Sequence, residues 1–348
     1  MSAALHVLSA GLATTLQDLG RAGYAQLGIP TGGALDPIAL RAANALVGNA
    51  QDAGAIEIAY AGPTLVVEAQ SVRMAFVGAD APIEVFPDMA TDRGRTVATM
   101  CSICLRRGEV VRIGSLSRGA LLYLAIEGGF AIEPVLGSVS TYLRGGFGGW
   151  HGRALVAGDR LPLRRHSSSD REEWRLTDLD LSVPTHLRVI DGPQIDHFAE
   201  EEVAAFFNSE YVVSAGDRMA MRLHGRRLRH CNGFDIVSDG TAAGSVQIAG
   251  SGEPIVLLAD RQTTGGYPKI ATIISADLPA AGRLPVGSNV RFERIDLKSA
   301  EALRRNLLAD IESIAGQIIP LGGSSEPAPS LLQCNLISGV IDACSSIP

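Results

Sequence analysis

Residues 253–275 read EPIVLLADRQTTGGYPKIATIIS and carry the clearest structural signal in the chain. Two short apolar runs, EPIVLLAD (253–260) and KIATIIS (269–275), are rich in Ile, Val, Leu and Thr, which favour strands. The residues between them are polar and contain a Gly-Gly pair, which is typical of a loop that allows close backbone approach. We therefore predict two buried strands joined by a polar, glycine-containing loop.

The same pattern of short apolar runs ended by Gly, Asp or Pro recurs along the chain. It is seen in PTLVVEA (63–69), VRMAFVG (72–78), GEVVRIG (108–114), LLYLAIEGG (121–129), HLRVIDGP (186–193), EYVVSAGDRMAMRL (210–223) and NVRFERI (289–295). Only three segments have a helical pattern. Asp36 is the expected N-cap of a helix at 36–48, and Asp196 that of a helix at 196–208. The third segment, 296–318, is amphipathic. The sequence predicts a mainly β protein with a few peripheral helices.

The length of 348 residues suits two domains, and a polar, Ser-rich stretch at 165–184 divides the chain. We expect β-rich halves at 1–182 and 183–298, then a helix and an apolar tail at 299–348.

Mean hydropathy is +0.18, but no run reaches the ~18 apolar residues of a membrane span. No basic segment opens the chain, so the cytoplasm is the expected location. A net charge of −7 argues against nucleic acid or anionic membrane as the main partner.

Common catalytic and metal motifs are absent from the sequence. It contains no G-x-S-x-G, Walker A, H-E-x-x-H or strand-linked G-x-G-x-x-G pattern. The seven histidines show no ligand spacing. Cys101 and Cys104 have redox or zinc spacing, but no second pair completes a site, and two thiols on opposite faces of a strand explain them. We expect no metal site.

Four clusters of polar residues and glycines remain as candidate sites. The first spans 14–36, where Gln17, Asp18 and Arg21 lie close together and Thr31-Gly32-Gly33 can turn N–H groups toward an anion. The alternative is a structural Asp18–Arg21 pair that braces a turn. The second spans 137–155, with the hydroxyls of Ser138, Ser140 and Thr141 beside a glycine-rich loop.

The third cluster spans 235–255 and contains Asp239 and Gln247. The fourth is the stretch 260–269, where Asp260 and Arg261 leave a buried strand and Lys269 opens the next one. Arg261 can bind a carboxylate or phosphate through two hydrogen bonds, and Lys269 supplies a point charge. A ligand site and a salt-bridged turn are the two interpretations of this loop.

In this order, the clusters resemble the biotin-dependent carboxyltransferase family, also described as allophanate hydrolase subunit 2, KipA or the C subunit of 5-oxoprolinase. The matching residues include TTLQDLGRAGYAQLGIPTGGALDPIALRAANALVGN (14–49), LAIEGGF (124–130), GSVSTYLRGGFGGWHGRAL (137–155) and SDGTAAGSVQIAGSGEPIVLLADRQTTGGYPKIATIISADL (238–278). The chain departs from the family pattern at Asp239, where Glu is usual, at 248–249 and at Ala220. Asp239 keeps the negative charge of the usual Glu, but its side chain is one methylene group shorter.

The resemblance implies a cyclophilin-like β-barrel architecture and a KipI-like partner, the B subunit of 5-oxoprolinase. It implies three functions. The first is the C subunit of an ATP-dependent 5-oxoprolinase, working with the A and B subunits and sharing ATP and Mg with them. The second is transfer of a carboxyl group from carboxybiotin, carried on a separate protein, to a urea- or amide-like acceptor. The third is a non-enzymatic protein that binds a KipI-like regulator.

For the first function, Asp260, Arg261, Lys269 and Asp36 are the expected catalytic residues, for oxyanion stabilisation and proton transfer. For the second, Thr263 and Thr264 are suited to hold the charge that develops on biotin. The expected substrate-binding residues are Gln17, Asp18, Arg21, Ser138, Ser140, Thr141, Asp239, Gln247, Gln262, Thr263, Thr264, Gly265, Gly266 and Tyr267.

Overall fold

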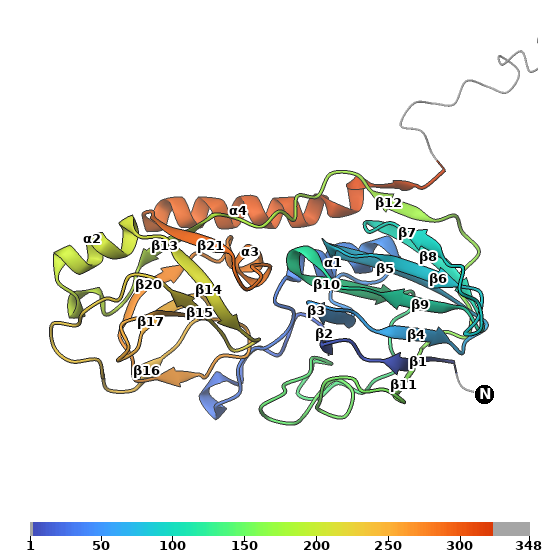
Figure 1. Cartoon of the computed structure of the whole chain (residues 1–348), viewed down its shortest axis with the longest axis horizontal. Coiled ribbons are helices and arrows are strands. Elements are labelled where there is room, and N and C mark those ends of the chain that lie inside the picture. The colour runs from blue at the N-terminus through green and yellow to red at the C-terminus, as the bar shows by residue number, and fades with distance from the viewer. Residues whose placement is uncertain (1–2, 323–348) are drawn as a thin grey trace, which may run out of the picture.

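A computed structural model describes residues 3–322 of the chain, and it has a β-sandwich and a closed β-barrel side by side (Figure 1). The long helix α4 (Leu297–Ser313) lies along one side of both parts, above the smaller helices α1 and α3 in this view. The predicted mainly β fold with a barrel and a few peripheral helices is confirmed.

The sandwich pairs two sheets. The six-stranded sheet has the order β11 (Arg160–Pro162), β1 (Ala4–Ser9), β4 (Thr64–Val67), β9 (Val110–Ile113), β6 (Ile83–Phe86) and β7 (Arg95–Val97). The seven-stranded sheet has the order β2 (Ala13–Gln17), β3 (Ala55–Ala59), β10 (Ser117–Ile126), β5 (Ser71–Asp80), β8 (Cys101–Arg106), β12 (Trp174–Leu176) and β22 (Ile318–Pro320).

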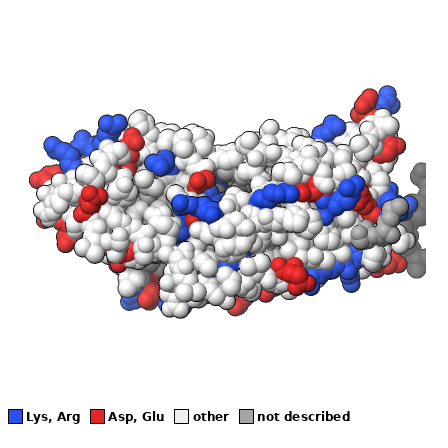
Figure 2. Space-filling model, turned by 90° about the horizontal axis from the view of Figure 1, so that it is seen from below, with Lys and Arg blue, Asp and Glu red and all other residues white. Residues whose placement is uncertain are grey.

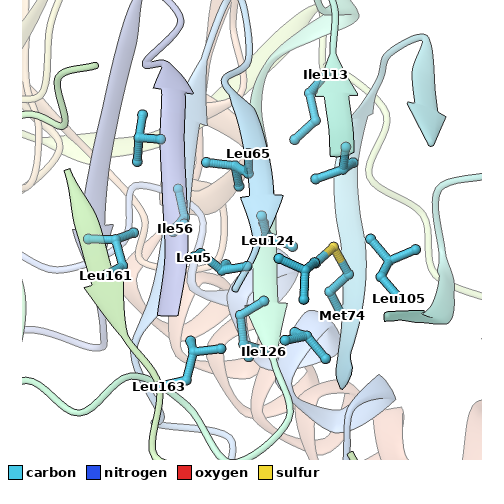
Figure 3. Packing of buried hydrophobic residues seen from close by; sticks show 14 of the residues in the cluster. Leu5, Ile56, Leu65, Met74, Leu105, Ile113, Leu124, Ile126, Leu161 and Leu163 are labelled. Atoms are coloured by element: carbon cyan, nitrogen blue, oxygen red, sulfur yellow. The ribbon is translucent and has the colours of Figure 1, made fainter. Parts of the chain in front are cut away.

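Alternating apolar residues from both sheets fill the sandwich interior, as in Leu5 on β1 and Leu124 on β10 (Figure 3). The outer face of the seven-stranded sheet is covered by α1 (Pro37–Leu46), whose Leu40 and Leu46 are fully buried against β5 and β10. Because β10 is covered on both faces, its sequence reads as a continuous apolar run.

The barrel has the order β13 (His186–Asp191), β20 (Lys269–Ile273), β17 (Ser245–Ile248), β18 (Pro254–Leu257), β15 (Ala220–His224), β14 (Tyr211–Gly216) and β21 (Asn289–Arg294). Two short strands, β16 (Asp239–Gly240) and β19 (Thr264–Gly265), form a separate antiparallel two-stranded sheet at its lower end (Figure 1). The strands β17 and β18 lie between them in sequence, and the pair is here called the β16–β19 hairpin for brevity. The remaining elements are α2 (Glu200–Asn208), α3 (Leu278–Gly282) and the short turns η1 (Ala25–Leu27), η2 (Ile195–His197) and η3 (Ile314–Gln317).

Two predicted helices differ from the structure. Asp196 does not cap a helix over 196–208, because it lies in the turn η2 and the extended residue Phe198 separates this turn from α2. The predicted helix 296–318 ends at Ser313, where η3 begins, although Asp296 caps its start by accepting a hydrogen bond from the Ser299 N–H at 2.7 Å. Asp36 caps α1 as predicted, through the N–H groups of Ile38 and Ala39.

The chain crosses between the two parts twice. The stretch 165–184 contributes β12 to the sandwich, and after α4 the strand β22 returns from the barrel to pair with β12. We propose 1–182 and 183–298 as the two domains, with 299–322 fastening one to the other. The predicted apolar tail lies mostly at 323–348, outside the described residues. Within 3–322, no helix is long and apolar enough to cross a bilayer.

Candidate functional site

Asp18 joins the first two sequence clusters. Its carboxylate accepts hydrogen bonds from Ser138 Oγ at 2.6 Å, Ser140 Oγ at 2.5 Å and the N–H of Val139 at 2.7 Å. Arg21 donates to the Ser140 carbonyl and stacks over the Phe147 ring, whose centroid lies 5.1 Å away. Since Asp18 uses its hydrogen-bonding capacity within the protein, it holds the glycine-rich loop in place.

The glycine-rich loop needs its glycines for close approach. Gly148 has a φ of +72°, and a Cβ there would lie 2.1 Å from the Ser140 carbonyl and 2.9 Å from Arg21 Nη2. Gln17 and Thr141 are also buried and bond to backbone carbonyls of this region, Thr141 Oγ1 to Leu16 at 3.0 Å and Gln17 Nε2 to Thr141 at 3.2 Å. The loop is a fixed wall rather than a mobile flap.

Lys269 joins the third and fourth clusters. Its buried Nζ donates to Asp239 Oδ2 at 2.7 Å and to the Gly240 carbonyl at 3.1 Å. Asp239 is half exposed, and Lys269 lowers its pKa through a hydrogen bond. Lys269 therefore ties the β16–β19 hairpin to the barrel wall.

Arg218 lies where the sandwich and barrel meet, in the turn between β14 and β15. It binds Asp260 through two hydrogen bonds, Nε to Oδ2 at 2.9 Å and Nη2 to Oδ1 at 3.0 Å. It also donates to Glu57 on β3 and, at 2.5 Å, to the Gly33 carbonyl. One guanidinium thus connects β3, the loop before α1 and the end of β18.

The buried charges around Arg218 shift one another's pKa. Burial alone would lower the pKa of Arg218, but Glu57 and Asp260 outweigh it and raise the pKa. Burial raises the pKa of Asp260, and Arg218 opposes that shift. A carboxyl with a raised pKa close to a fixed cation is a common arrangement for proton transfer.

A second acid, Asp36, lies behind this pair. Its Oδ1 caps α1, and Oδ2 accepts from Arg283 Nη1 at 3.2 Å. The Asp36 N–H donates to Tyr123 Oη at 2.8 Å, and this hydroxyl donates to Glu57 Oε2 at 2.6 Å. Burial raises the pKa of Asp36, and the carboxylate has no exposed surface. Within the described residues, the Asp36 carboxylate therefore caps α1 and pairs with Arg283.

Arg21 leaves one donor unused. Its side chain is buried, and Nη1 has no hydrogen-bond partner among the described residues. Gly32, with a φ of +62°, lies beside it, and a Cβ at Gly32 would be 3.5 Å from Arg21 Nη1 and 3.4 Å from Asp260 Oδ1. The position that a side chain at Gly32 would occupy, here called the Gly32 slot, is therefore close to both a donor and an acceptor.

Three cavities surround this region. A pocket of about 350 Å³, here called the arginine pocket, lies against α4 and reaches Gly32. A second, of about 180 Å³, lies between sandwich and barrel and is lined by Glu57 and Arg218. Both share Leu35 and Leu258, so the charged cluster lies between them. The third, of about 300 Å³, is on the barrel and is lined by Gln247, Gln262 and Tyr267.

The structure divides the predicted residues into three groups. Asp260 and Arg21 face the Gly32 slot, while Arg261 lines the arginine pocket. Gln247, Gln262 and Tyr267 line the barrel pocket, and a Cβ at Gly265 would lie 2.7 Å from Gln247 Nε2. A further set has internal partners: Gln17, Asp18, Ser138, Ser140, Thr141, Asp36, Asp239 and Lys269, with Thr263, Thr264 and Gly266 in backbone pairing of the hairpin region.

Sequence reasoning missed Glu57, Tyr123, Arg218 and Arg283. Glu57 and Tyr123 are cross-strand neighbours within apolar strands. A single acid inside AIEIA (55–59) is the signal that could have identified Glu57, because a buried charge requires a partner.

Among residues 3–322 no group of three or more His, Cys, Asp or Glu could hold a metal ion. The face that carries the η1 loop, the glycine-rich loop and the β16–β19 hairpin shows broad uncharged areas with small groups of acidic and basic side chains (Figures 1 and 2). It has no extended basic patch of the kind that binds nucleic acid.

The sandwich and the barrel are thus joined by the buried cluster of Arg218, Glu57 and Asp260. The family model described as "Carboxyltransferase domain, subdomain A and B" matches residues 27–294, and the chain belongs to this family.

Relatives within the family have two kinds of name. The chain is 34% identical over 316 residues to the 5-oxoprolinase C subunit of Escherichia coli, covering 90% of this chain and 98% of that one. It is 35% identical to the protein of the same name from Haemophilus influenzae, with 86% and 94% covered. The crystal structure of the K. lactis urea amidolyase matches with a TM-score of 0.82 and 27% identity over 92% of this chain, but over only 21% of that longer chain.

Proposed function

We propose that the chain is the C subunit of an ATP-dependent 5-oxoprolinase, which opens a lactam at its C–N bond. The observation that carries the proposal is the similarity, over 90% and 86% of this chain, to two proteins named as the C subunit of 5-oxoprolinase, of which 98% and 94% are covered. Urea amidolyase contains the corresponding domain only as a small part of a longer chain.

The Gly32 slot suits a lactam. A lactam presents a carbonyl oxygen that accepts a hydrogen bond and an N–H that donates one. Arg21 Nη1 is an unused donor close to the Gly32 slot, and Asp260 Oδ1, which already accepts from Arg218, is an acceptor close to it. Hydrogen bonding by Arg21 polarises the carbonyl, and Asp260 orients the ring nitrogen.

Opening the lactam adds water to the carbonyl carbon, breaks the bond to nitrogen and leaves a carboxylate and an amine that has gained a proton. Asp260, with its raised pKa, is the group placed to move that proton. ATP supplies the free energy for this reaction when bound. Because residues 3–322 contain no cluster for a metal ion, Mg would arrive with the nucleotide or be held by a partner.

The name of these relatives, which describes one subunit of an enzyme, supports an assembly with further subunits. We propose a hetero-oligomer in the cytoplasm that also contains a KipI-like B subunit together with the A subunit. In a KipA-like role, the chain would bind the same KipI-like partner without catalysis. The assay described below tests this role as well.

Carboxyl transfer is the second candidate, favoured by the family description and the urea amidolyase similarity. The Gly32 slot would then take a urea- or amide-like acceptor. Thr263 and Thr264, next to the barrel pocket, would hold biotin delivered by a separate carrier.

The test is an assay of the purified chain, alone and with the A and B subunits. The proposal predicts ATP- and 5-oxoproline-dependent release of glutamate that requires this chain. Urea- or amide-dependent ATP turnover with biotin carboxylase components, and no glutamate release, would establish the second function instead. Tight binding to the KipI-like partner with neither activity would establish the non-enzymatic role.

A further inference from the structure

The arginine pocket has three cations and no acid in its lining. Arg41 comes from α1, Arg261 from the loop after β18 and Arg304 from α4. The pocket therefore brings together three segments that are far apart in the sequence, and α4 contributes Arg304, Leu307, Leu308 and Ile311 to its lining.

These cations lack carboxylate partners among the described residues. Arg261 donates only to backbone carbonyls, Nε to Thr241 at 3.2 Å and Nη1 to Leu258 at 3.5 Å, and burial lowers its pKa. Arg41 donates from Nη1 to Gln51 at 3.1 Å, and its buried Nε has no partner in this part of the chain. Arg41 and Arg261 are partly buried, whereas Arg304 is exposed. Partly buried guanidinium groups without counter-charge, such as the first two, are costly unless an anion joins them.

The rest of the lining is mostly apolar, with Thr31 and Ser275 as its uncharged polar side chains. Leu307, Leu308 and Ile311 of α4 face Leu278 and Pro279 of α3 across it. A volume of about 350 Å³ lies within the usual range for small-molecule sites. The pocket therefore suits a ligand with an anionic group at one end and an apolar or flat body at the other.

We propose that the arginine pocket binds a phosphate-bearing small molecule of the nucleotide class. Its phosphates lie among Arg41, Arg261 and Arg304, and its organic part lies against α4. Phosphate is favoured over a single carboxylate because three guanidinium groups match a polyanion. The inference rests on the proposed function, and it would place the phosphate donor at the mouth of the Gly32 slot.

Binding to the full-length chain, without its partners, tests this proposal. Isothermal titration with ATP, ADP and pyrophosphate should give saturable binding that weakens as salt is raised. Arg304→Gln should weaken ATP binding by roughly tenfold, the effect of one charge-assisted contact. Arg305→Gln is the matched control, since Arg305 is the exposed neighbour on α4 and is outside the pocket lining. It should leave the affinity unchanged.

Three results would overturn the inference: no saturable binding of ATP, ADP or pyrophosphate, equal effects of the two substitutions, or binding of 5-oxoproline or glutamate in place of the phosphates. If Arg304→Gln disturbs α4, Arg41→Gln, on α1, tests the same prediction of weaker ATP binding independently. The titration measures nucleotide binding and needs no turnover, so its result does not depend on whether the chain supports 5-oxoproline hydrolysis. Nucleotide binding without glutamate release in the full assembly would contradict only the latter.

Discussion

Arg218 is the residue on which the junction between sandwich and barrel depends. It is nearly buried, with 11% of its side chain exposed, and it forms ion pairs with both Glu57 and Asp260. Removing one member of a buried ion pair leaves an uncompensated charge, which typically costs ~3 to 5 kcal/mol.

Arg218→Met should therefore lower the free energy of unfolding by about 3 to 5 kcal/mol near neutral pH. In the variant, Glu57 and Asp260 face each other without a cation, so at least one folded-state carboxyl pKa rises above its unfolded value. Such a group binds more protons when folded, and stability falls as pH rises through the raised pKa. Urea unfolding at pH 5 and pH 8 should show the smaller deficit at pH 5.

Arg222→Met is the control for this prediction, because Arg222 is exposed on the adjoining strand β15. A loss below about 1 kcal/mol for Arg218→Met, or a deficit independent of pH, would show that the two acids are not held by this arginine.

The β16–β19 hairpin has few residues and is held mainly by contacts from outside its own strands. Only two residue pairs join the strands, Asp239 with Gly265 and Gly240 with Thr264. Lys269, on the neighbouring strand β20, reaches both Asp239 and the Gly240 carbonyl. Short paired segments of this kind open locally unless such tertiary contacts hold them.

Lys269→Met should keep the apolar stem and remove the contacts to the hairpin. Amide hydrogen exchange at 239–241 and 263–265 should become faster, while exchange in β5 and β10 stays unchanged. Lys298→Met, at the exposed start of α4, is the control substitution. Unchanged exchange in the hairpin would mean that backbone pairing alone holds it.

The strands are the most predictable elements, because their β-favouring composition and the Gly, Asp or Pro residues at their ends indicate the same boundaries. The run 210–223 contains a turn within an otherwise apolar pattern, and the structure divides it into β14 and β15. Arg218 lies in that turn, and nothing in the local sequence distinguishes it from an arginine in an ordinary solvent-exposed turn. The Asp196 cap failed because Phe198 is extended and packs near His230, at a ring distance of 5.0 Å.

The arrangement of the two halves could not be deduced from the sequence. The four clusters were identified from composition, and the structure joins them in two pairs, through Asp18 and through Lys269. The pairs meet where the Gly32 N–H donates to the Ala259 carbonyl at 3.3 Å and where Arg218 binds Asp260. Arg218, for example, binds Asp260 and Glu57, which are 42 and 161 residues away in sequence. Contacts over such separations leave no local sequence pattern.

The central claim is that the Gly32 slot receives the lactam, and one comparison tests it directly. Gly32→Ala places a methyl group 3.5 Å from Arg21 Nη1 and 3.4 Å from Asp260 Oδ1. Gly28→Ala has a similar positive φ, +80°, but no atom within 4 Å of the new methyl. Both should lose about 1 kcal/mol of stability from the left-handed backbone.

The measurement is kcat/KM for glutamate release from 5-oxoproline by the full assembly, with each variant in turn. The account predicts a loss of at least about tenfold for Gly32→Ala, from a blocked hydrogen-bonding position, and near wild-type activity for Gly28→Ala. Equal activity of the two variants would contradict a lactam site at Gly32.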